Sequence, residues 1–272
     1  MRIRIAHEIG RRFSPPARSI IQNLRLTPRS HEAQYVLSWR VSLDVDGALR
    51  QSEDALGNLV HSFSRYGPLD GLTILAEGEV ETADSVGVVR GAVEPLPAEM
   101  FLRASPMAQI GGALRDFAAQ AVAGAATPLE KLHRLMAALH ALMNFDPLKT
   151  DEADDAAAAF ALRRGGCRDY VHVFVACARW LGIPARFVRG YVAPSEDFSA
   201  PGLYAWAEAY DPVLGWVAFD PVAKVCADER YVRVIVGFDG QDCAAVRSAH
   251  SGGEERSESA VTVEQAGGQS QG

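Results

Sequence analysis

The sequence GGCRDY, residues 165–170, decides how this chain folds. Two glycines permit a tight turn, and the run that follows from Cys167 to Leu181 is apolar on almost every side. A helix without a polar face is a buried helix. We therefore expect a central buried helix that begins at Cys167 and ends near Gly182, where a glycine C-cap belongs.

Cys167 stands in the first turn of this predicted helix. Unpaired backbone N–H groups and the positive end of the helix dipole favour a thiolate there. A strand is expected to follow at Ala185–Tyr191. Cysteine acyl-transfer enzymes place their nucleophile in this way, at the start of a helix that a strand follows. A cysteine at a helix start is also often a small buried hydrophobic residue. This stretch alone leaves both roles open.

Composition limits the classes of function. The chain has 272 residues, 48% of them hydrophobic, and a formal net charge of -7. The acidic balance argues against a nucleic-acid partner. The four cysteines show neither C-x-x-C nor zinc-finger spacing, so we expect no metal site, and we expect no cofactor. They are Cys167, Cys177, Cys226 and Cys243.

The expected location follows from three further features. A chain of this length folds without disulfides, and reduced cysteines suit a reducing compartment. The opening residues MRIRI alternate as a strand does and do not form a signal peptide. No apolar run approaches the roughly 18 residues of a membrane span. We therefore expect a cytoplasmic protein with no membrane partner.

The pattern divides the chain into three parts. Residues 1–97 alternate polar and apolar residues between turn dipeptides, as in a small sandwich or barrel with strands at short intervals. Residues 98–246 begin with alanine-rich helices, at 107–123 and after Thr127, and continue as the predicted core. Residues 247–272 are a polar tail, with one edge strand at most around 260–263 and disorder from Ala266 onward.

Four motifs in chain order resemble the bacterial transglutaminase-like family: GGCRDY at 165–170, LGIPARFVRGY at 181–191, AWAEAY at 205–210 and GWVAFDP at 215–221. The β-rich first part resembles the N-terminal domain that accompanies this family. The resemblance implies an α+β fold: a β-sandwich-like N-terminal domain, then a papain-like core with an antiparallel sheet packed on the central helix. The implied chemistry is thiol acyl transfer to an amine or to water, as in transglutaminase-like cysteine proteases.

Carried over by position, the resemblance makes Cys167 the nucleophile and Asp220 the orienting carboxylate. The family's histidine position, immediately before the Ala-Trp pair, is occupied here by Tyr204. A phenol with a pKa of about 10 carries no positive charge and is a poor base at neutral pH. We therefore expect impaired catalysis, and at most a modest lowering of the Cys167 pKa by the helix start and Arg168.

Other residues are candidates for support. The family carries a similar C-R-D string, so Arg168 and Asp169 are expected beside the cleft, and Trp206 is expected to line or support it. His172 should face away from the thiol, because five residues rotate a helix by about 140° beyond one turn.

Three hypotheses follow. The first is an impaired family member that binds peptide or protein in its cleft. The second is a working cysteine hydrolase or acyltransferase in which another group replaces the histidine base. The third is a purely structural role. The geometric prediction is that Tyr204 and Asp220 face Cys167 from neighbouring antiparallel strands.

Overall fold

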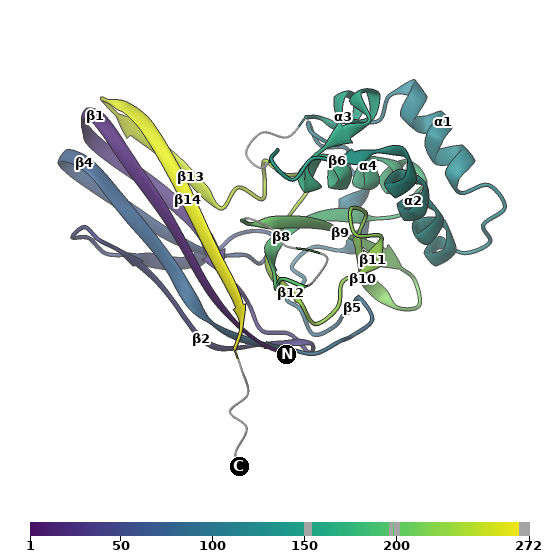
Figure 1. The fold of residues 1–272 in the computed structure, drawn as a ribbon, viewed down its shortest axis with the longest axis horizontal. Coiled ribbons are helices and arrows are strands. Elements are labelled where there is room, and N and C mark those ends of the chain that lie inside the picture. The colour runs from purple at the N-terminus through teal and green to yellow at the C-terminus, as the bar shows by residue number, and fades with distance from the viewer. Residues whose placement is uncertain (150–153, 196–197, 199–201, 267–272) are drawn as a thin grey trace, which may run out of the picture.

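The computed structural model describes residues 1–149, 154–195, 198 and 202–266. It has an α+β architecture in which a sheet of long strands lies beside a second sheet that carries the helices (Figure 1). Both parts agree with the fold class predicted from the sequence. Within the described residues, no helix has the length and apolar character needed to cross a membrane.

The first sheet contains six antiparallel strands around the neighbouring strands β1 and β4. Burial alternates along β1, which places Ile3, Ile5 and Ile9 inward, as its polar–apolar alternation predicts. The strands are β1 (Arg2–Thr27), β2 (Gln34–Leu43), β3 (Arg50–Glu53), β4 (Leu59–Thr82), β13 (Val246–Ser251) and β14 (Glu254–Gln265).

Two of these strands are much longer than the short, closely spaced strands expected from the sequence. Strand β1 has 26 residues and β4 has 24. Pairing between them shifts register between Arg12 and Ala17 and again before Ser19. Such irregularities let a strand bend without ending, so turn-like sequence around Pro15 lies inside one strand.

The predicted polar tail instead joins the first sheet. Strand β14 pairs with residues 3–14 of β1, and β13 pairs with residues 19–24 of the same strand. These strands are largely exposed, so their sequence lacks the apolar alternation that identifies a buried strand. Disorder was expected from Ala266 onward, but the Ala266 N–H donates a 2.9 Å hydrogen bond to the Arg2 carbonyl oxygen, and residues 267–272 lie outside the described residues.

The second sheet has the strand order β11-β10-β9-β8-β12, with β5 added beside β10. Its strands are β5 (Val88–Val89), β8 (Ala185–Val192), β9 (Tyr204–Asp211), β10 (Gly215–Asp220), β11 (Val225–Cys226) and β12 (Tyr231–Gly237). The helices are η1 (Ala98–Leu102), α1 (Gly112–Ala121), α2 (Pro128–Leu142), α3 (Ala156–Leu162) and α4 (Cys167–Trp180), and the short strands β6 (Asn144–Phe145) and β7 (Arg164–Gly165) pair in parallel.

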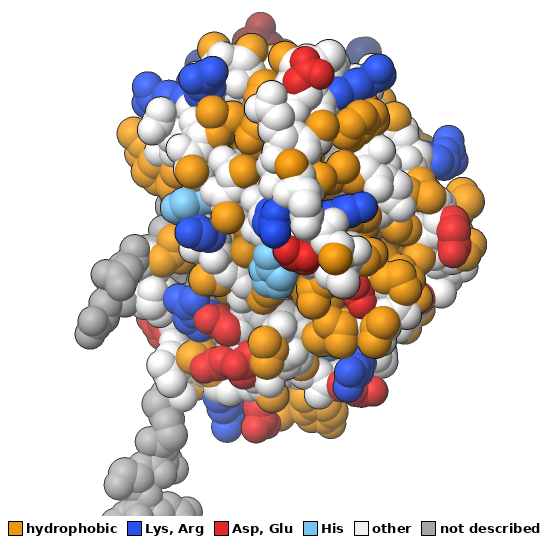
Figure 2. Space-filling view, turned by 90° about the vertical axis from the view of Figure 1, so that its right-hand side faces the viewer, with side chains coloured by type: hydrophobic (Ala, Val, Ile, Leu, Met, Phe, Trp, Pro, Cys, Tyr) orange, Lys and Arg blue, Asp and Glu red, His pale blue; other side chains and the backbone are white. Residues whose placement is uncertain are grey.

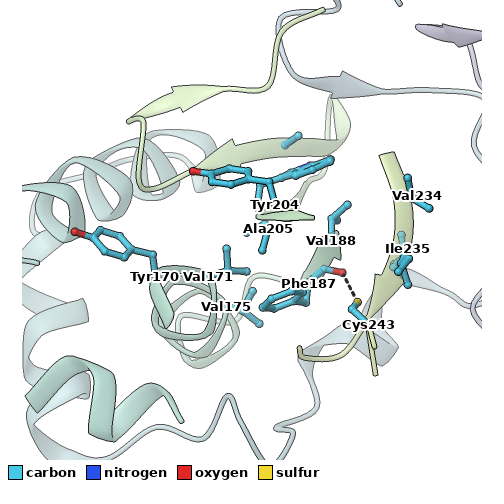
Figure 3. Packing of buried hydrophobic residues seen from close by; sticks show 14 of the residues in the cluster. Tyr170, Val171, Val175, Phe187, Val188, Tyr204, Ala205, Val234, Ile235 and Cys243 are labelled. Atoms are coloured by element: carbon cyan, nitrogen blue, oxygen red, sulfur yellow. Dashed lines mark hydrogen bonds between the residues drawn. The ribbon is translucent and has the colours of Figure 1, made fainter. Parts of the chain in front are cut away.

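Helix α4 begins at Cys167, as predicted, and is buried from Asp169 to Arg179. It packs on the sheet face that carries the alternate alanines of β9, which are Ala205, Ala207 and Ala209. Figure 3 shows Ala205 and Phe187 pointing toward Val171 and Val175 of the helix. Small side chains on β9 allow this close approach. Alternation then places Tyr204 and Trp206 on the opposite face.

Buried amides join the two sheets. Asn58 exchanges two hydrogen bonds of 2.8 Å with the backbone of Val236, as a neighbouring strand would. Gln34 does the same with Arg233, at 2.9 and 2.7 Å. In addition, His7 of β1 lies 3.0 Å from the Tyr191 hydroxyl. The first sheet is therefore fixed directly to the core strands β8 and β12.

Candidate active site

The turn before Cys167 is held by Asp169. This buried carboxylate accepts hydrogen bonds from the backbone N–H groups of Gly166 at 2.8 Å and Asp154 at 2.7 Å. The Lys149 ammonium lies 3.1 Å from the same carboxylate. Asp169 therefore fixes the start of α4, and with it the position of the half-buried Cys167.

The two glycines of the GGC motif are required by space. A Cβ atom on Gly166 would lie 2.1 Å from the Lys149 carbonyl oxygen, and one on Gly165 would lie 2.5 Å from the Asp169 carboxylate. Neither approach is compatible with a side chain, so both positions depend on glycine.

Tyr204 and Asp220 meet on neighbouring antiparallel strands. The Tyr204 hydroxyl donates a hydrogen bond of 3.1 Å to Oδ1 of Asp220. Both side chains are buried, and the charges of Cys167 and Asp220 both act on Tyr204. The structure thus brings the three predicted site residues into one neighbourhood, and their catalytic roles stay predictions.

Tyr231 completes the surroundings of Asp220 and was missed by the sequence reasoning. Its hydroxyl donates a 2.7 Å hydrogen bond to Oδ2 of Asp220, while the backbone N–H groups of Val222 and Ala223 donate to Oδ1 at 2.8 and 3.1 Å. Nothing in the spacing of the sequence identifies Tyr231, because its position depends on the register of β12 against β8.

The protonation states follow from burial. Burial, followed by the charge of Asp220, raises the pKa of Tyr204 far above that of a free phenol. Burial also raises the pKa of Asp220, while its four hydrogen-bond donors oppose that effect. Tyr204 is therefore a neutral donor whose proton is directed at Asp220.

Burial raises the pKa of the Cys167 thiol to about 11. The Ala205 backbone N–H, which hydrogen-bonds the sulfur, and the positive charges of Arg189 and Arg168 act in the opposite direction but more weakly. Burial therefore outweighs the modest lowering expected from the helix start and Arg168, and the net shift of the pKa is upward. The sequence shows the helix start but does not show how far the sulfur is removed from water.

Trp206 packs against Tyr231, the residue that hydrogen-bonds Asp220. Its indole is buried and packs edge-on against the Tyr231 ring, with ring centroids 5.4 Å apart. A Cβ atom on Gly190 would lie 2.7 Å from this indole and 1.9 Å from the Val232 carbonyl oxygen. Gly190 therefore lets Trp206 and β12 close around Asp220.

The predicted supporting residue Arg168 lies near Gly240 and lines a cleft, and His172 lies near the same glycine. His172 is buried and accepts a 3.0 Å hydrogen bond from the Gly240 N–H, while its other ring nitrogen lies 3.1 Å from the Asp154 carbonyl oxygen. Burial lowers the pKa of His172 to about 4. His172 is therefore a neutral bridge between segments rather than a base for Cys167.

Arg189 of β8 is a second residue that the sequence reasoning missed. It is the cross-strand partner of Ala205, and its charge acts on Cys167. The signal was present, because an arginine in a buried strand requires a counter-charge or a function, and β8 contains two, Arg186 and Arg189. Among the described residues, no group of three or more His, Cys, Asp or Glu side chains could hold a metal ion.

The surface of the core is mixed in character. On the face seen in Figure 2, acidic, basic and apolar side chains are interspersed, so that no single charge dominates there.

Comparison with known families matches residues 115–221 to the transglutaminase-like superfamily and residues 3–81 to the bacterial transglutaminase-like N-terminal region. An uncharacterized protein of Mycobacterium leprae is 27% identical over 92% of this chain and 94% of its own length. An uncharacterized protein of Mycobacterium tuberculosis is 26% identical over 90% of this chain and 86% of its own.

The fold has a counterpart among solved structures. A protein from Cytophaga hutchinsonii named as a candidate cysteine protease superposes with a TM-score of 0.78, covering 99% of this chain and 92% of that one. Its sequence identity is 18%, so this likeness concerns the fold.

Proposed function

Because the chain belongs to the bacterial transglutaminase-like family, in its N-terminal region as well as in its core, we propose that it binds peptide or protein in the cleft beside Cys167, with its acyl-transfer chemistry impaired. One observation carries the proposal: the position of the histidine base holds Tyr204, whose hydroxyl donates to Asp220. Tyr204 and Asp220 do not give the thiol a proton acceptor comparable to imidazole.

The electrostatics support the same conclusion. With a pKa of about 11, the Cys167 sulfur is a thiol at neutral pH. Thiols are poor nucleophiles compared with thiolates. The remaining stabilising groups, such as the Ala205 N–H, act on the sulfur but do not remove its proton.

The test is the pH dependence of Cys167 alkylation. Cys226 is the other half-buried cysteine, so the measurement uses the Cys226→Ser protein, with iodoacetamide and mass spectrometry of the peptide that carries Cys167. We expect slow alkylation at pH 6 to 8 and acceleration only above pH 9. Rapid alkylation at pH 6 would favour the alternative, a working hydrolase or acyltransferase with a different base.

Binding and chemistry are measured separately. Fluorescently labelled casein serves as the polypeptide probe for binding, and incorporation of dansylcadaverine into unlabelled casein reports acyl transfer. We expect saturable binding without incorporation above the Cys167→Ala level. Incorporation that depends on Cys167 contradicts impairment, and the absence of casein binding contradicts the binding role.

A further inference from the structure

A cleft of about 460 Å³ lies between the first sheet and the core, beside the start of α4. One wall is β1 and the other is formed by α4, β8 and the segment before β13. None of the described residues that line it is acidic, and three are arginines. The lining residues are Ile9, Arg11, Arg168, Arg189, Gly240, Gln241, Ala244, Ala245 and Val246.

Arg189 is the unusual member of this cleft. Its Nε atom is buried without a hydrogen-bond partner, and Nη1 makes only a 3.5 Å contact with the Cys243 carbonyl oxygen. No carboxylate of the described residues forms an ion pair with it. By contrast, the buried Arg186 on the same strand has carboxylate partners, because Glu94 and Glu208 pair with it at 2.5 and 2.7 Å. A largely buried guanidinium without an anion is costly.

A second arginine of the core wall, Arg168, lines the cleft with Arg189. Burial and then the charge of Arg168 lower the pKa of Arg189 to about 10. The acidic groups nearby are already engaged. Asp239 accepts backbone N–H groups, including that of Gln241 at 2.9 Å, and Asp242 pairs with Arg247 at 3.4 Å.

Arg11 brings the third guanidinium from the other wall. It is 9% exposed and pairs through Nη1 with Glu255 of β14, while its Nε is buried without a partner. Glu255 also lies 3.2 Å from His250. The first sheet thus contributes a positioned cation to a cleft whose other wall belongs to the core.

Two residues that line the cleft lie close to Cys167. Arg189 pairs across strands with Ala205, whose N–H hydrogen-bonds the Cys167 sulfur, and Arg168 follows Cys167 in the chain. We propose that this cleft binds a carboxylate of the peptide or protein ligand, held by Arg189 with Arg11 and Arg168, so that the protein prefers acidic sequences beside the amide presented to Cys167. The peptide part of this proposal rests on the proposed function. Arginine suits the task because its planar fork matches a carboxylate.

The test compares two labelled, capped pentapeptides that differ only by one glutamate or glutamine, using fluorescence anisotropy with the full-length Cys167→Ala protein. We expect the glutamate peptide to bind about 10-fold more tightly, the strength of one charge-assisted contact. Arg189→Gln should abolish the preference, and Arg11→Gln should reduce it. Arg115→Gln is the matched control, because it removes the same charge from an exposed position of α1. Circular dichroism verifies that each variant is folded.

Equal affinity for the two peptides would overturn the inference, and so would an unchanged preference in folded Arg189→Gln. If Arg189→Gln does not fold, the inference is tested by two other measurements. The Cys167→Ala protein should prefer the glutamate peptide, and Arg11→Gln should reduce this preference. If neither peptide binds, the proposed function fails, and titration with glutarate and inorganic phosphate tests the cleft by itself. Saturable glutarate binding that Arg189→Gln removes supports the inference. Tighter phosphate binding, or no saturable binding of either anion, contradicts it.

Discussion

Two buried carboxylates stand on the same face of the core sheet, and their surroundings differ. Glu208 on β9 lies between Arg186 and Arg233, each 2.7 Å away, and the charges of these cations lower its pKa to about 2 despite burial. Among the described residues, two phenols and two backbone N–H groups donate hydrogen bonds to Asp220 on β10, and burial raises its pKa.

The two carboxylates therefore differ in their counter-charge. Glu208 is part of a network of ion pairs, whereas Asp220 has no described cation as a partner. Arg186 and Arg233 balance Glu208, so that nothing further is needed there. Asp220 is fully hydrogen-bonded but no described cation pairs with it. An imidazolium at position 204 would supply that charge next to Cys167. Under the proposed function, Asp220 is a carboxylate placed to orient a histidine, and Tyr204 occupies the position of that histidine.

Tyr204→His should have the largest effect, because it gives Asp220 the cation that Glu208 already has. We expect the pKa of Cys167 to fall by several pH units and the alkylation rate at pH 7 to rise at least about 100-fold. The smaller ring should cost about 1 kcal/mol of stability. Iodoacetamide kinetics in the Cys226→Ser background measure the gain. Tyr204→Phe is the control, since it removes the hydroxyl without adding a base; equal rates in the two variants would refute the explanation.

Glu208→Gln should break the balanced network. Two buried guanidinium groups would lose their shared counter-charge, and we expect the free energy of unfolding to fall by about 3–5 kcal/mol. Urea denaturation followed by circular dichroism measures the change. The exposed Glu130, paired with Arg134 on α2, provides the comparison, and Glu130→Gln should have little effect. Similar small losses for both variants would show that the network contributes little.

As the pH falls, the contributions of Glu208 and Asp220 to folding stability should change in opposite directions. The lowered pKa of Glu208 contributes stability that is present above its unfolded pKa of about 4.5 and is lost as the pH falls toward 2, by about 3 kcal/mol. The raised pKa of Asp220 gives a contribution that is present below its unfolded pKa and is lost as the pH rises. Between pH 5 and pH 2, Glu208→Gln should therefore flatten the loss of stability and Asp220→Asn should steepen it. Urea midpoints at several pH values test this, and parallel curves for both variants would contradict it.

Tyr231→Phe should have the smallest effect. It leaves Oδ2 of Asp220 without its 2.7 Å donor, at a cost of about 1–3 kcal/mol. Thermal and urea unfolding measure the loss. The exposed Tyr35 gives a matched control through Tyr35→Phe, which should change nothing measurable. A loss no larger than that of the control would mean that the carboxylate does not need the second phenol.

Local patterns were enough to predict part of this site. Paired glycines and an apolar run placed Cys167 at a helix start, because these signals lie within a few residues of their consequence. Tyr204 and Asp220 were placed through the family resemblance of the ordered motifs. Tyr231 and Arg189 could not be placed in this way, since they reach the site only through the pairing of β12, β8 and β9. The raised pKa of Cys167 depends on packing of segments distant in sequence.

The same limit applies to the first sheet. The alternation of β1 and β4 predicted strands, but their length depends on irregular pairing that carries them past turn-like sequence. Strands β13 and β14 are exposed and polar, and only their partner β1 makes them strands.

The position of β1 has a consequence for biosynthesis. This strand is made first, and β4 pairs with one of its edges, but its other edge receives β13 and β14, which are made after the whole core. Until residue 265 has left the ribosome, a strand of 26 residues presents an open edge. Open edges invite pairing with other chains. Before β13 and β14 pair with this edge, it is open to such pairing, and the arginine-lined cleft does not yet have the residues that precede β13.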